Sequence, residues 1–202
     1  MTEKNAKIIR DFMEHIKGAD TEDFMRNMLY CFCAPTITGI KAACLINFRR
    51  NKGENMRSLW KLHADEWLSP LGLEWILFDE HCGSDNALVL IYRRDLLVKA
   101  LGCDMACDIL AEYGYPLHDV DACLECLRGK FCGGFPHEIG LFLDYPPEDV
   151  RGFIEGRCAK NSGCPGYWKV YGDVRRAERI FRKYKRAECD AARRIMTGKA
   201  AI

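Results

Sequence analysis

Apolar side chains recur along this chain mostly at the three- and four-residue spacing of helices, and a few short continuous apolar runs interrupt that pattern. The helical spacing predicts one helix over residues 5–17 and a second that begins at Thr21, which we expect to cap it. A third helix is predicted from Glu54 to Trp67. The chain is therefore expected to begin with two helices before its first strand.

The continuous apolar runs are typical of strands. We expect a turn at Ala34–Thr36 and then a strand over residues 38–47. The runs Leu73–Phe78 and Ala87–Tyr92 predict two further strands that pair as an antiparallel hairpin. A last short strand is predicted at Tyr167–Tyr171.

Between the predicted hairpin and the last strand, the helical spacing returns. Helices are predicted from Asp95 to Leu101 and from Asp104 to Tyr113, each with aspartate near its start and glycine after its end. A third has an apolar stripe and ends near Gly129; the stripe is Leu117, Val120, Leu124 and Leu127.

The stretch from Phe135 to Glu155 predicts two short helices around a tight break. Pro136 suits a first helical turn, because proline has no N–H to leave unpaired there. The break falls at Asp144–Pro147, since a residue before proline is disfavoured in a helix. After Gly172 and Asp173, a long amphipathic helix is expected, with its inward face formed by Val174, Ala177, Phe181 and Tyr184.

These elements predict an α+β fold, with a small, partly antiparallel sheet of about four strands covered by helices. We expect a helical N-terminal extension over residues 1–30, a single α+β domain over 31–190 and a C-terminal tail over 191–202. A chain of 202 residues is long enough for one well-packed domain.

Composition narrows the class of protein only a little. The net charge is +1, which gives no general attraction to nucleic acid or to a membrane, and no apolar run reaches the roughly 18 residues of a transmembrane helix. The first residues lead into an amphipathic pattern rather than a signal peptide. We therefore expect a cytoplasmic protein with no nucleic-acid or membrane partner. Common nucleotide-binding, hydrolase and zinc-protease motifs are missing from the sequence.

The first candidate for chemistry combines Cys33 with His137 and Glu138. A thiol nucleophile needs a base to form thiolate and a third group to orient that base. Cys33 lies in a predicted turn before a strand, and His137 and Glu138 are adjacent at a predicted helix start. The alternative is that Cys33 packs in the interior and that His137 makes a hydrogen bond at the helix start.

The twelve cysteines suggest a second candidate, a metal site. Cys123 and Cys126 have C-x-x-C spacing, Cys132 follows closely, and Cys158 and Cys164 flank a glycine. Thiolates are natural ligands of zinc and of iron–sulfur clusters, so iron, iron–sulfur or zinc is the expected cofactor if four thiolates converge. The alternative is a set of reduced thiols, since cysteines three residues apart share a helix face without any metal.

A third candidate is the basic C-terminal helix. Residues 173–199 contain ten Lys or Arg and four Asp or Glu. Such an excess of basic residues usually forms the solvated outer face of an amphipathic helix. The alternative is that these residues form a docking surface for an acidic partner. A helix-turn-helix over residues 138–154 is disfavoured, because its second helix begins with two acidic residues.

Several blocks resemble a bacterial family, domain of unknown function 3793. They are the FPHEIG run from Phe135 to Gly140, the Cys-Ala-Pro-Thr block from Cys33 to Lys41, and the Trp168–Tyr171 block. The resemblance covers roughly residues 30–190. This chain has Asp144 where the family usually has glycine, and its cysteines around 158–164 are spaced differently.

The resemblance implies a cytosolic protein of anaerobic bacteria, with links to iron uptake and to flavodoxins, and it brings no established activity. We expect Lys41 and Trp168 to bind a cofactor and the basic helix to dock an acidic redox protein such as a flavodoxin. The leading hypothesis is an accessory protein of iron or thiol redox metabolism. The alternatives are a cysteine-dependent enzyme with Cys33 as nucleophile and His137 as base, and a structural interaction module.

Overall fold

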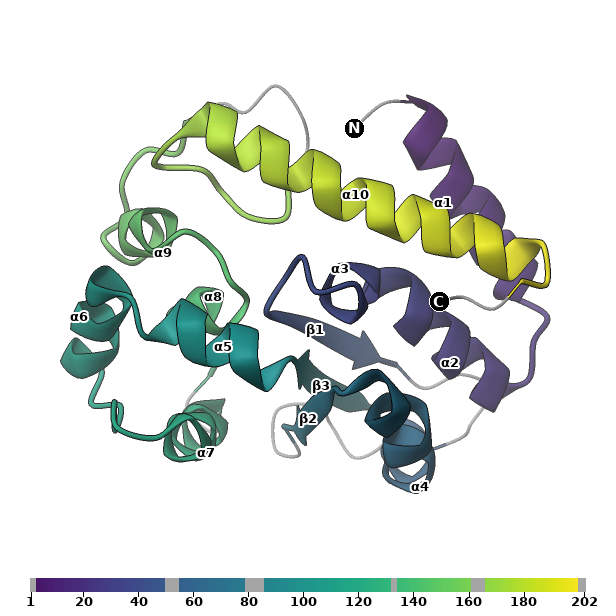
Figure 1. Cartoon of the computed structure of the whole chain (residues 1–202), viewed down its shortest axis with the longest axis horizontal. Helices are drawn as coiled ribbons and strands as arrows, with labels where there is room; N and C mark the ends of the chain where they lie inside the picture. Colours follow the sequence, from purple (N-terminus) through teal and green to yellow (C-terminus); the bar gives the residue numbers. More distant parts are fainter. Residues whose placement is uncertain (1–2, 50–54, 79–85, 132–133, 161–165, 200–202) are drawn as a thin grey trace.

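The computed structural model describes residues 3–49, 55–78, 86–131, 134–160 and 166–199. Within them, a small antiparallel sheet is surrounded by helices (Figure 1). The strands are β1 (Ala43–Phe48), β2 (Glu74–Leu77) and β3 (Ala87–Tyr92). The helices are α1 (Glu3–Ile16), α2 (Thr21–Phe32), α3 (Ala34–Ile37), α4 (Met56–Leu68), α5 (Arg94–Leu101), α6 (Asp104–Glu112), α7 (Val120–Lys130), α8 (Ile139–Phe142), α9 (Pro147–Ile154) and α10 (Val174–Met196).

Strand β3 is the centre of the sheet, in the order β1-β3-β2, and both of its neighbours are antiparallel to it. Its six residues are all apolar and all buried, as expected of a strand covered on both faces. Ala43 pairs with Tyr92 at one end of β1, and Phe48 pairs with Ala87 at the other. The predicted antiparallel hairpin of the second and third strands is thus confirmed.

Alternate residues of β3 point into two separate cores. Val89 and Ile91 pack with α2 and α4 around Trp60, whereas Leu88 and Leu90 pack with the helices from α5 to α9. Because side chains alternate across a strand, one apolar run supplies both cores. The molecule therefore has an α+β architecture with helices on both sides of the sheet, as the apolar pattern predicts.

The long helix α10 lies across the top of the molecule and runs beside α1 (Figure 1). Its inward residues include Ala177, Phe181 and Tyr184, as predicted. The helix continues to Met196, and Ala192 packs against Phe12 in a small apolar cluster with α1. No helix among the described residues has the length and the apolar character needed to cross a membrane.

The structure corrects two expected strands. The first strand begins at Ala43 instead of residue 38, and Ala34–Thr36 belongs to the short helix α3 rather than to a turn. Tyr167–Tyr171 is irregular, so that the described sheet has three strands instead of about four. The reason is a contact with a distant segment, because the amide of Tyr171 donates to the Asp149 carboxylate instead of to a neighbouring strand.

Smaller corrections concern helix ends. Asp20, not Thr21, caps α2 by accepting a hydrogen bond from the Asp23 amide. Pro136 lies before α8, which begins only at Ile139. Leu117 lies outside α7 and is exposed. Each of these predictions depended on a helix start, the least certain part of a spacing pattern.

Asp144 follows α8 with a left-handed backbone, at φ 60°. Glycine adopts such angles without steric cost, and aspartate is among the few other residues that tolerate them. Here the Asp144 carboxylate also accepts a hydrogen bond from the Ala42 amide at 3.2 Å. The aspartate therefore joins the break between α8 and α9 to the segment that leads into β1.

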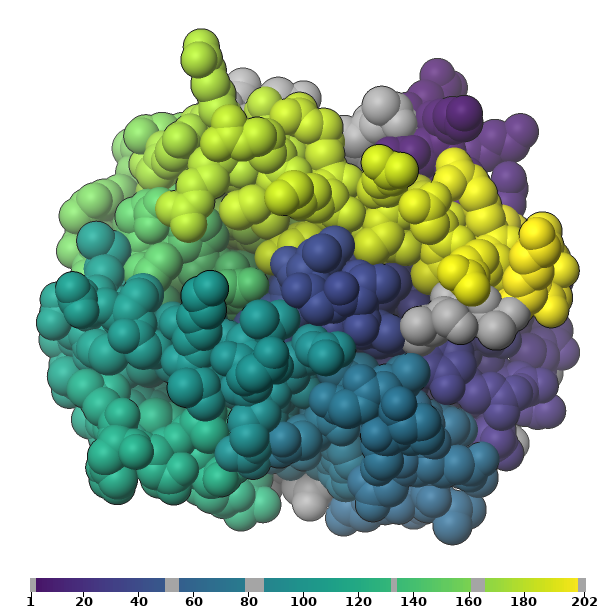
Figure 2. Space-filling view, viewed as in Figure 1, coloured from purple at the N-terminus to yellow at the C-terminus, as the bar shows by residue number. Residues whose placement is uncertain are grey.

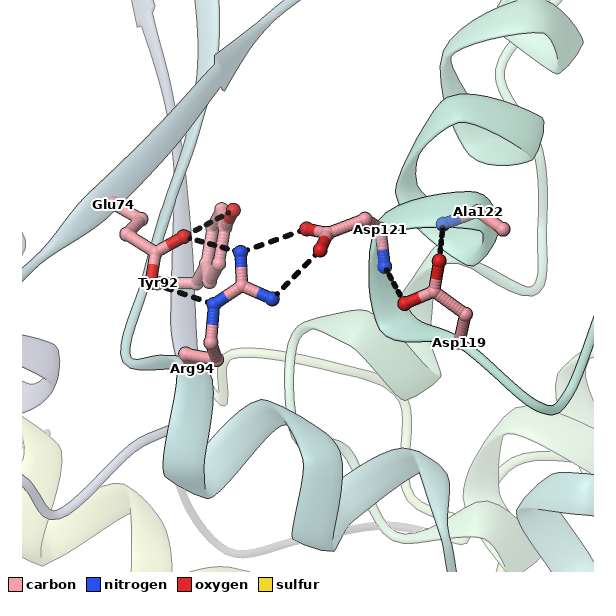
Figure 3. A network of polar contacts seen from close by, with 6 residues as sticks. All are labelled: Glu74, Tyr92, Arg94, Asp119, Asp121 and Ala122. Carbon is pink, nitrogen blue, oxygen red and sulfur yellow. Dashed lines mark hydrogen bonds and ion pairs between the residues drawn. The ribbon is translucent and has the colours of Figure 1, made fainter.

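Arg94 connects the sheet to α7 (Figure 3). Its guanidinium donates to both carboxylate oxygens of Glu74 at 2.8 and 2.7 Å, and to both of Asp121 at 3.0 and 2.7 Å. Tyr92 donates to the same Glu74 carboxylate. The hydrogen bonds from Arg94 lower the pKa of both carboxyl groups below the ordinary range. The native protein therefore binds fewer protons than the unfolded chain at acidic pH, and stability rises with pH in that window.

Replacing Arg94 by methionine should lower the melting temperature by a few degrees at pH 7, a small change because the groups are partly exposed. Arg94 contributes to the free energy of unfolding at pH values above the ordinary carboxyl pKa of about 4. This contribution is lost as the pH falls through the lowered pKa values of Glu74 and Asp121. Melting curves of both proteins between pH 7 and about pH 3 should therefore converge on the acidic side. Arg128→Met, which removes an exposed ion pair with Glu125 within one helix, is the control. A pH-independent difference for Arg94→Met would contradict this account.

Candidate functional site

A cavity of about 640 Å³ lies between β1, the segment from Phe135 to α9, the irregular segment 167–169 and α10. Its walls are mainly aromatic and aliphatic, with a few charged side chains among them. A mainly apolar pocket with a few polar groups is the usual form of a small-molecule site. The elements that enclose it are distant in sequence and meet beside the sheet (Figure 1).

Lys41 is a buried cationic residue in the wall of the cavity. Its side chain is 7 % exposed, and its ammonium lies over the rings of Tyr145, Tyr167 and Tyr184 at 5.6, 5.9 and 5.4 Å. Among the described residues, no carboxylate forms an ion pair with it. A buried ammonium that lies over aromatic faces and has no ion pair within the described residues retains unused hydrogen-bonding capacity.

The chain before Lys41 fixes its direction. Helix α3 ends after one turn, and Gly39 follows with a left-handed backbone at φ 72°. The Lys41 amide then donates to the Pro35 carbonyl at 3.1 Å, which closes the loop onto α3. Lys41 therefore approaches the cavity from a short, hydrogen-bonded turn.

Glu188 brings the only α10 carboxylate to the cavity wall within the described residues. The side chain is buried and accepts hydrogen bonds from the Tyr167 hydroxyl at 2.7 Å and from the Lys185 ammonium at 2.5 Å. Burial, and then the Glu188 charge, raise the pKa of Tyr167. Tyr167 therefore remains a neutral donor, and Glu188 is already paired.

Asp149 anchors the aromatic wall. It is 3 % exposed and accepts hydrogen bonds from the Trp168 indole at 2.7 Å and from the amides of Tyr171 and Gly172, both at 2.6 Å. Trp168 in turn stacks on Tyr145, with 4.6 Å between the ring centroids. One carboxylate on α9 thus determines where the indole lies.

Cys44 lies on β1 in the cavity wall, close enough to Cys33 for the two thiols to shift each other's pKa. The two residues differ in access, because Cys33 is fully buried and does not line the cavity. Donation of its proton to Cys44, together with burial, raises the pKa of Cys33 well above its ordinary value. The Cys33 thiol is therefore protonated in the resting protein.

Three of the residues predicted for chemistry meet at this cavity: Lys41, Trp168 and His137. His137 is exposed and lies edge to face with Phe153 at 5.1 Å. Glu138 points elsewhere, since it is buried and accepts a hydrogen bond from Tyr115 at 3.0 Å. Neither Cys33 nor Glu138 lines the cavity, so the geometry does not assemble the expected nucleophile, base and orienting group.

A family model described as a protein of unknown function, DUF3793, matches residues 29–202. The chain belongs to this family. Comparisons with curated proteins and with solved structures found no match. In this DUF3793 member, the three blocks on which the resemblance rests each contribute to the cavity wall, through Lys41, His137 and Trp168.

The cysteines expected to bind metal in this DUF3793 protein are dispersed where the structure describes them. Cys123 is buried, with its thiol 3.1 Å from the Pro116 carbonyl oxygen. Cys126 is half-buried and Cys158 is exposed, while Cys132 and Cys164 lie outside the described residues. Among those that are described, no group of three potential ligands converges. Binding of iron, an iron–sulfur cluster or zinc stays a prediction of the sequence.

Helix α10 lies on the surface of the molecule and packs against α3 (Figure 2). Lys183, Arg186 and Arg194 line a second hollow of about 420 Å³ there, together with exposed Ile40. Arg186 is already paired with Asp190. Docking of an acidic partner such as a flavodoxin stays a prediction.

Several residues of the site escaped the sequence analysis because each has an ordinary local role. Cys44 reads as one apolar residue of a strand, Asp149 as an acidic residue in a first helical turn, and Glu188 as one charge on a basic helix. Only their burial against distant segments distinguishes them. The closest signal was the position of Cys44, three residues after Lys41, which ends a block that resembles the family.

Proposed function

We propose that this protein binds a small organic anion with a planar, apolar body in the cavity beside Lys41. The observation that carries the proposal is the Lys41 ammonium, which is buried among three tyrosine rings without a carboxylate partner in the described structure. An anionic group of the ligand would supply that partner, and Trp168 and Tyr145 would contact its planar body.

The rim of the cavity supports the same proposal. Phe135 and Phe153 are 48 % and 41 % exposed, although both are large apolar residues. His137 and Lys169 lie beside them at the cavity wall. Exposed aromatic residues around an apolar pocket are typical of an entrance for an apolar ligand.

Such a ligand would be consistent with the cofactor-binding accessory role expected from the sequence, in which Lys41 and Trp168 are the cofactor-binding residues. We also propose that this accessory role belongs to the iron or thiol redox metabolism of anaerobes. The cysteine-dependent enzyme with Cys33 and His137 receives no support from the geometry, because Cys33 is sealed from the cavity.

Binding of naphthoate and of its neutral analogue naphthamide tests the proposal. We expect naphthoate to bind more tightly to the unmodified protein, and Lys41→Met to weaken naphthoate binding roughly 10- to 100-fold, since a charge-assisted hydrogen bond contributes about 1.5–3 kcal/mol. Naphthamide should bind both proteins about equally. Isothermal titration calorimetry gives both affinities.

Lys130→Met is the matched control. Lys130 also lies over two tyrosine rings, at 5.9 and 5.0 Å, but it does not line the cavity. Naphthoate binding by Lys130→Met should match that of the unmodified protein. Equal affinity of Lys41→Met and the unmodified protein for naphthoate, with both folded, would overturn the proposal.

A further inference from the structure

Cys33 and Cys44 come from different elements and meet at the edge of the cavity. Cys33 lies between α2 and α3, and Cys44 is the second residue of β1. The Cys44 thiol also lies 3.6 Å from the Phe32 carbonyl oxygen, toward which its proton can point. Its sulfur is then free to accept a hydrogen bond from Cys33. Because Phe32 directly precedes Cys33, the contact with the Phe32 carbonyl places the Cys44 sulfur beside the backbone of Cys33, within the range in which a disulfide can be formed if the side chains rotate toward each other.

The two thiols differ in what can reach them. Cys33 has no exposed surface, whereas Cys44 is 9 % exposed and lines the cavity. A reagent that enters the cavity therefore meets the Cys44 sulfur first. Cys33 lies behind it, in the position of a second thiol that attacks a mixed disulfide from within the protein.

The charges around the pair favour the same order of events. The hydrogen bond from Cys33 is the main effect that lowers the pKa of Cys44, and the Lys41 ammonium lowers it further, against the effect of burial. The Glu188 carboxylate opposes this effect. Thiolate is the attacking form in thiol–disulfide exchange, so Cys44 is the residue prepared to react and Cys33 the one that stays protonated until later.

We propose that Cys44 and Cys33 form a reversible dithiol that exchanges with a small organic disulfide admitted to the cavity. The Cys44 thiolate attacks one sulfur of the disulfide R–S–S–R, the S–S bond breaks, and one R–S⁻ leaves and takes up a proton. Cys33 then loses its proton and attacks the Cys44 sulfur, the S–S bond between Cys44 and the remaining R–S group breaks, and the second R–S⁻ leaves and takes up a proton. The protein dithiol is oxidised to a Cys33–Cys44 disulfide, and the organic disulfide is reduced to two thiols.

This exchange would also act on the ligand site. The new bond would close a loop over residues 33–44, which contains α3 and Lys41. The proposed exchange depends on the cavity and on the proximity of the two thiols. It does not depend on which anion Lys41 binds. A protein that binds anions poorly could still carry out the exchange.

The test uses the full chain, reduced and then treated without oxygen with dithiodiglycolate, a small disulfide with two carboxylates. Free thiols are alkylated after unfolding, and the linkages are mapped by peptide mass spectrometry. We expect a Cys33–Cys44 linkage and release of thioglycolate. Exposed Cys103 and Cys158 should carry mixed disulfides, which shows that the reagent is active. Mixed disulfides at these two positions with Cys33 and Cys44 still reduced would overturn the proposal.

Cys31 and Cys189 are an internal control, because both are buried and neither lines the cavity; both should stay reduced. In Cys33→Ser, the mixed disulfide should remain on Cys44, and in Cys44→Ser, Cys33 should stay reduced. A Cys33 that reacts without Cys44 would contradict the order of attack. Because the linkage is mapped in the unmodified chain as well, the test does not depend on the folding of either variant.

Two further reactions separate this proposal from the anion site. Cystamine, a disulfide with two ammonium groups, should react more slowly than dithiodiglycolate, and this preference should disappear in Lys41→Met. The Cys33–Cys44 linkage should still form in that variant. If the unmodified protein shows no preference for dithiodiglycolate over cystamine but still forms the linkage, only the proposed anion site is contradicted. Absence of the Cys33–Cys44 linkage in the unmodified protein would overturn the dithiol proposal.

Discussion

Replacing Asp149 by alanine should destabilise the protein by about 3–5 kcal/mol, because three partly buried donors lose one buried carboxylate at once and a buried group left unpaired costs about 1–3 kcal/mol. The three donors are the Trp168 indole and the amides of Tyr171 and Gly172. Asp149 is itself 3 % exposed, so water cannot replace it without rearrangement. Chemical denaturation of both proteins measures the difference.

The same variant should also change the cavity. Trp168 would lose the hydrogen bond that directs its indole, and its stacking on Tyr145 would loosen. We therefore expect a weaker aromatic near-ultraviolet circular dichroism signal and weaker naphthoate binding under conditions in which the variant is folded.

Glu148→Ala is the control for Asp149→Ala. Glu148 is the preceding residue of the same helix, and its carboxylate forms an ion pair with exposed Arg176 at 3.1 Å. Such pairs contribute about 0–1 kcal/mol. A loss for Asp149→Ala no larger than for Glu148→Ala would show that the carboxylate does not hold segment 167–172.

Gly152→Ala should destabilise the protein by about 2–3 kcal/mol, in the range of overpacking in a full core. A Cβ at Gly152 would lie 2.5 Å from both Cβ and Cγ of Tyr171. These atoms are close to the backbone of a segment that Asp149 already holds, so a side-chain rotation cannot relieve the contact. Thermal and chemical denaturation measure the effect.

The matched control is Gly129→Ala. Gly129 is also inside a helix, α7, but a Cβ added there would meet no atom of another residue within 4 Å, apart from its chain neighbours and the backbone of its own helix. Alanine at this position should stabilise the protein by about 0.5–1 kcal/mol through its higher helix propensity. The two substitutions should thus have opposite signs, and a stabilising Gly152→Ala would contradict the close packing of α9 on the 166–172 segment.

The apolar pattern predicted elements best where the apolar residues form a clear stripe or a continuous run. Helix α10 and strand β3 are examples, because an amphipathic stripe and a continuous β-rich run each have a clear local period. The prediction was wrong for Tyr167–Tyr171, which has a strand-like composition. The amides of Tyr171 and of the next residue bind the side chain of Asp149, and nothing in the local sequence signals that partner.

The sequence predicted only part of the candidate site, because it does not show which way each side chain faces. Lys41, His137 and Trp168 stand in distinctive blocks, and the structure brings all three to one cavity. Cys33 stands in the same kind of block but faces the interior, where Cys44 separates it from the cavity. Whether a side chain at a turn faces a cavity or a core depends on the element packed above it, which sequence spacing does not contain.

By itself, the sequence determined the α+β class, the antiparallel pairing of Leu73–Phe78 with Ala87–Tyr92, the break at Asp144–Pro147 and the inward face of the last helix. All of these follow from interactions between near neighbours, such as periodicity, proline geometry and glycine angles. Only the tertiary structure decided that Asp149 accepts a hydrogen bond from Trp168 and that Cys44, rather than Cys33, lines the cavity. It also decided that Lys41 is buried among tyrosines from three distant segments, because long-range packing sets burial and hydrogen-bond partners.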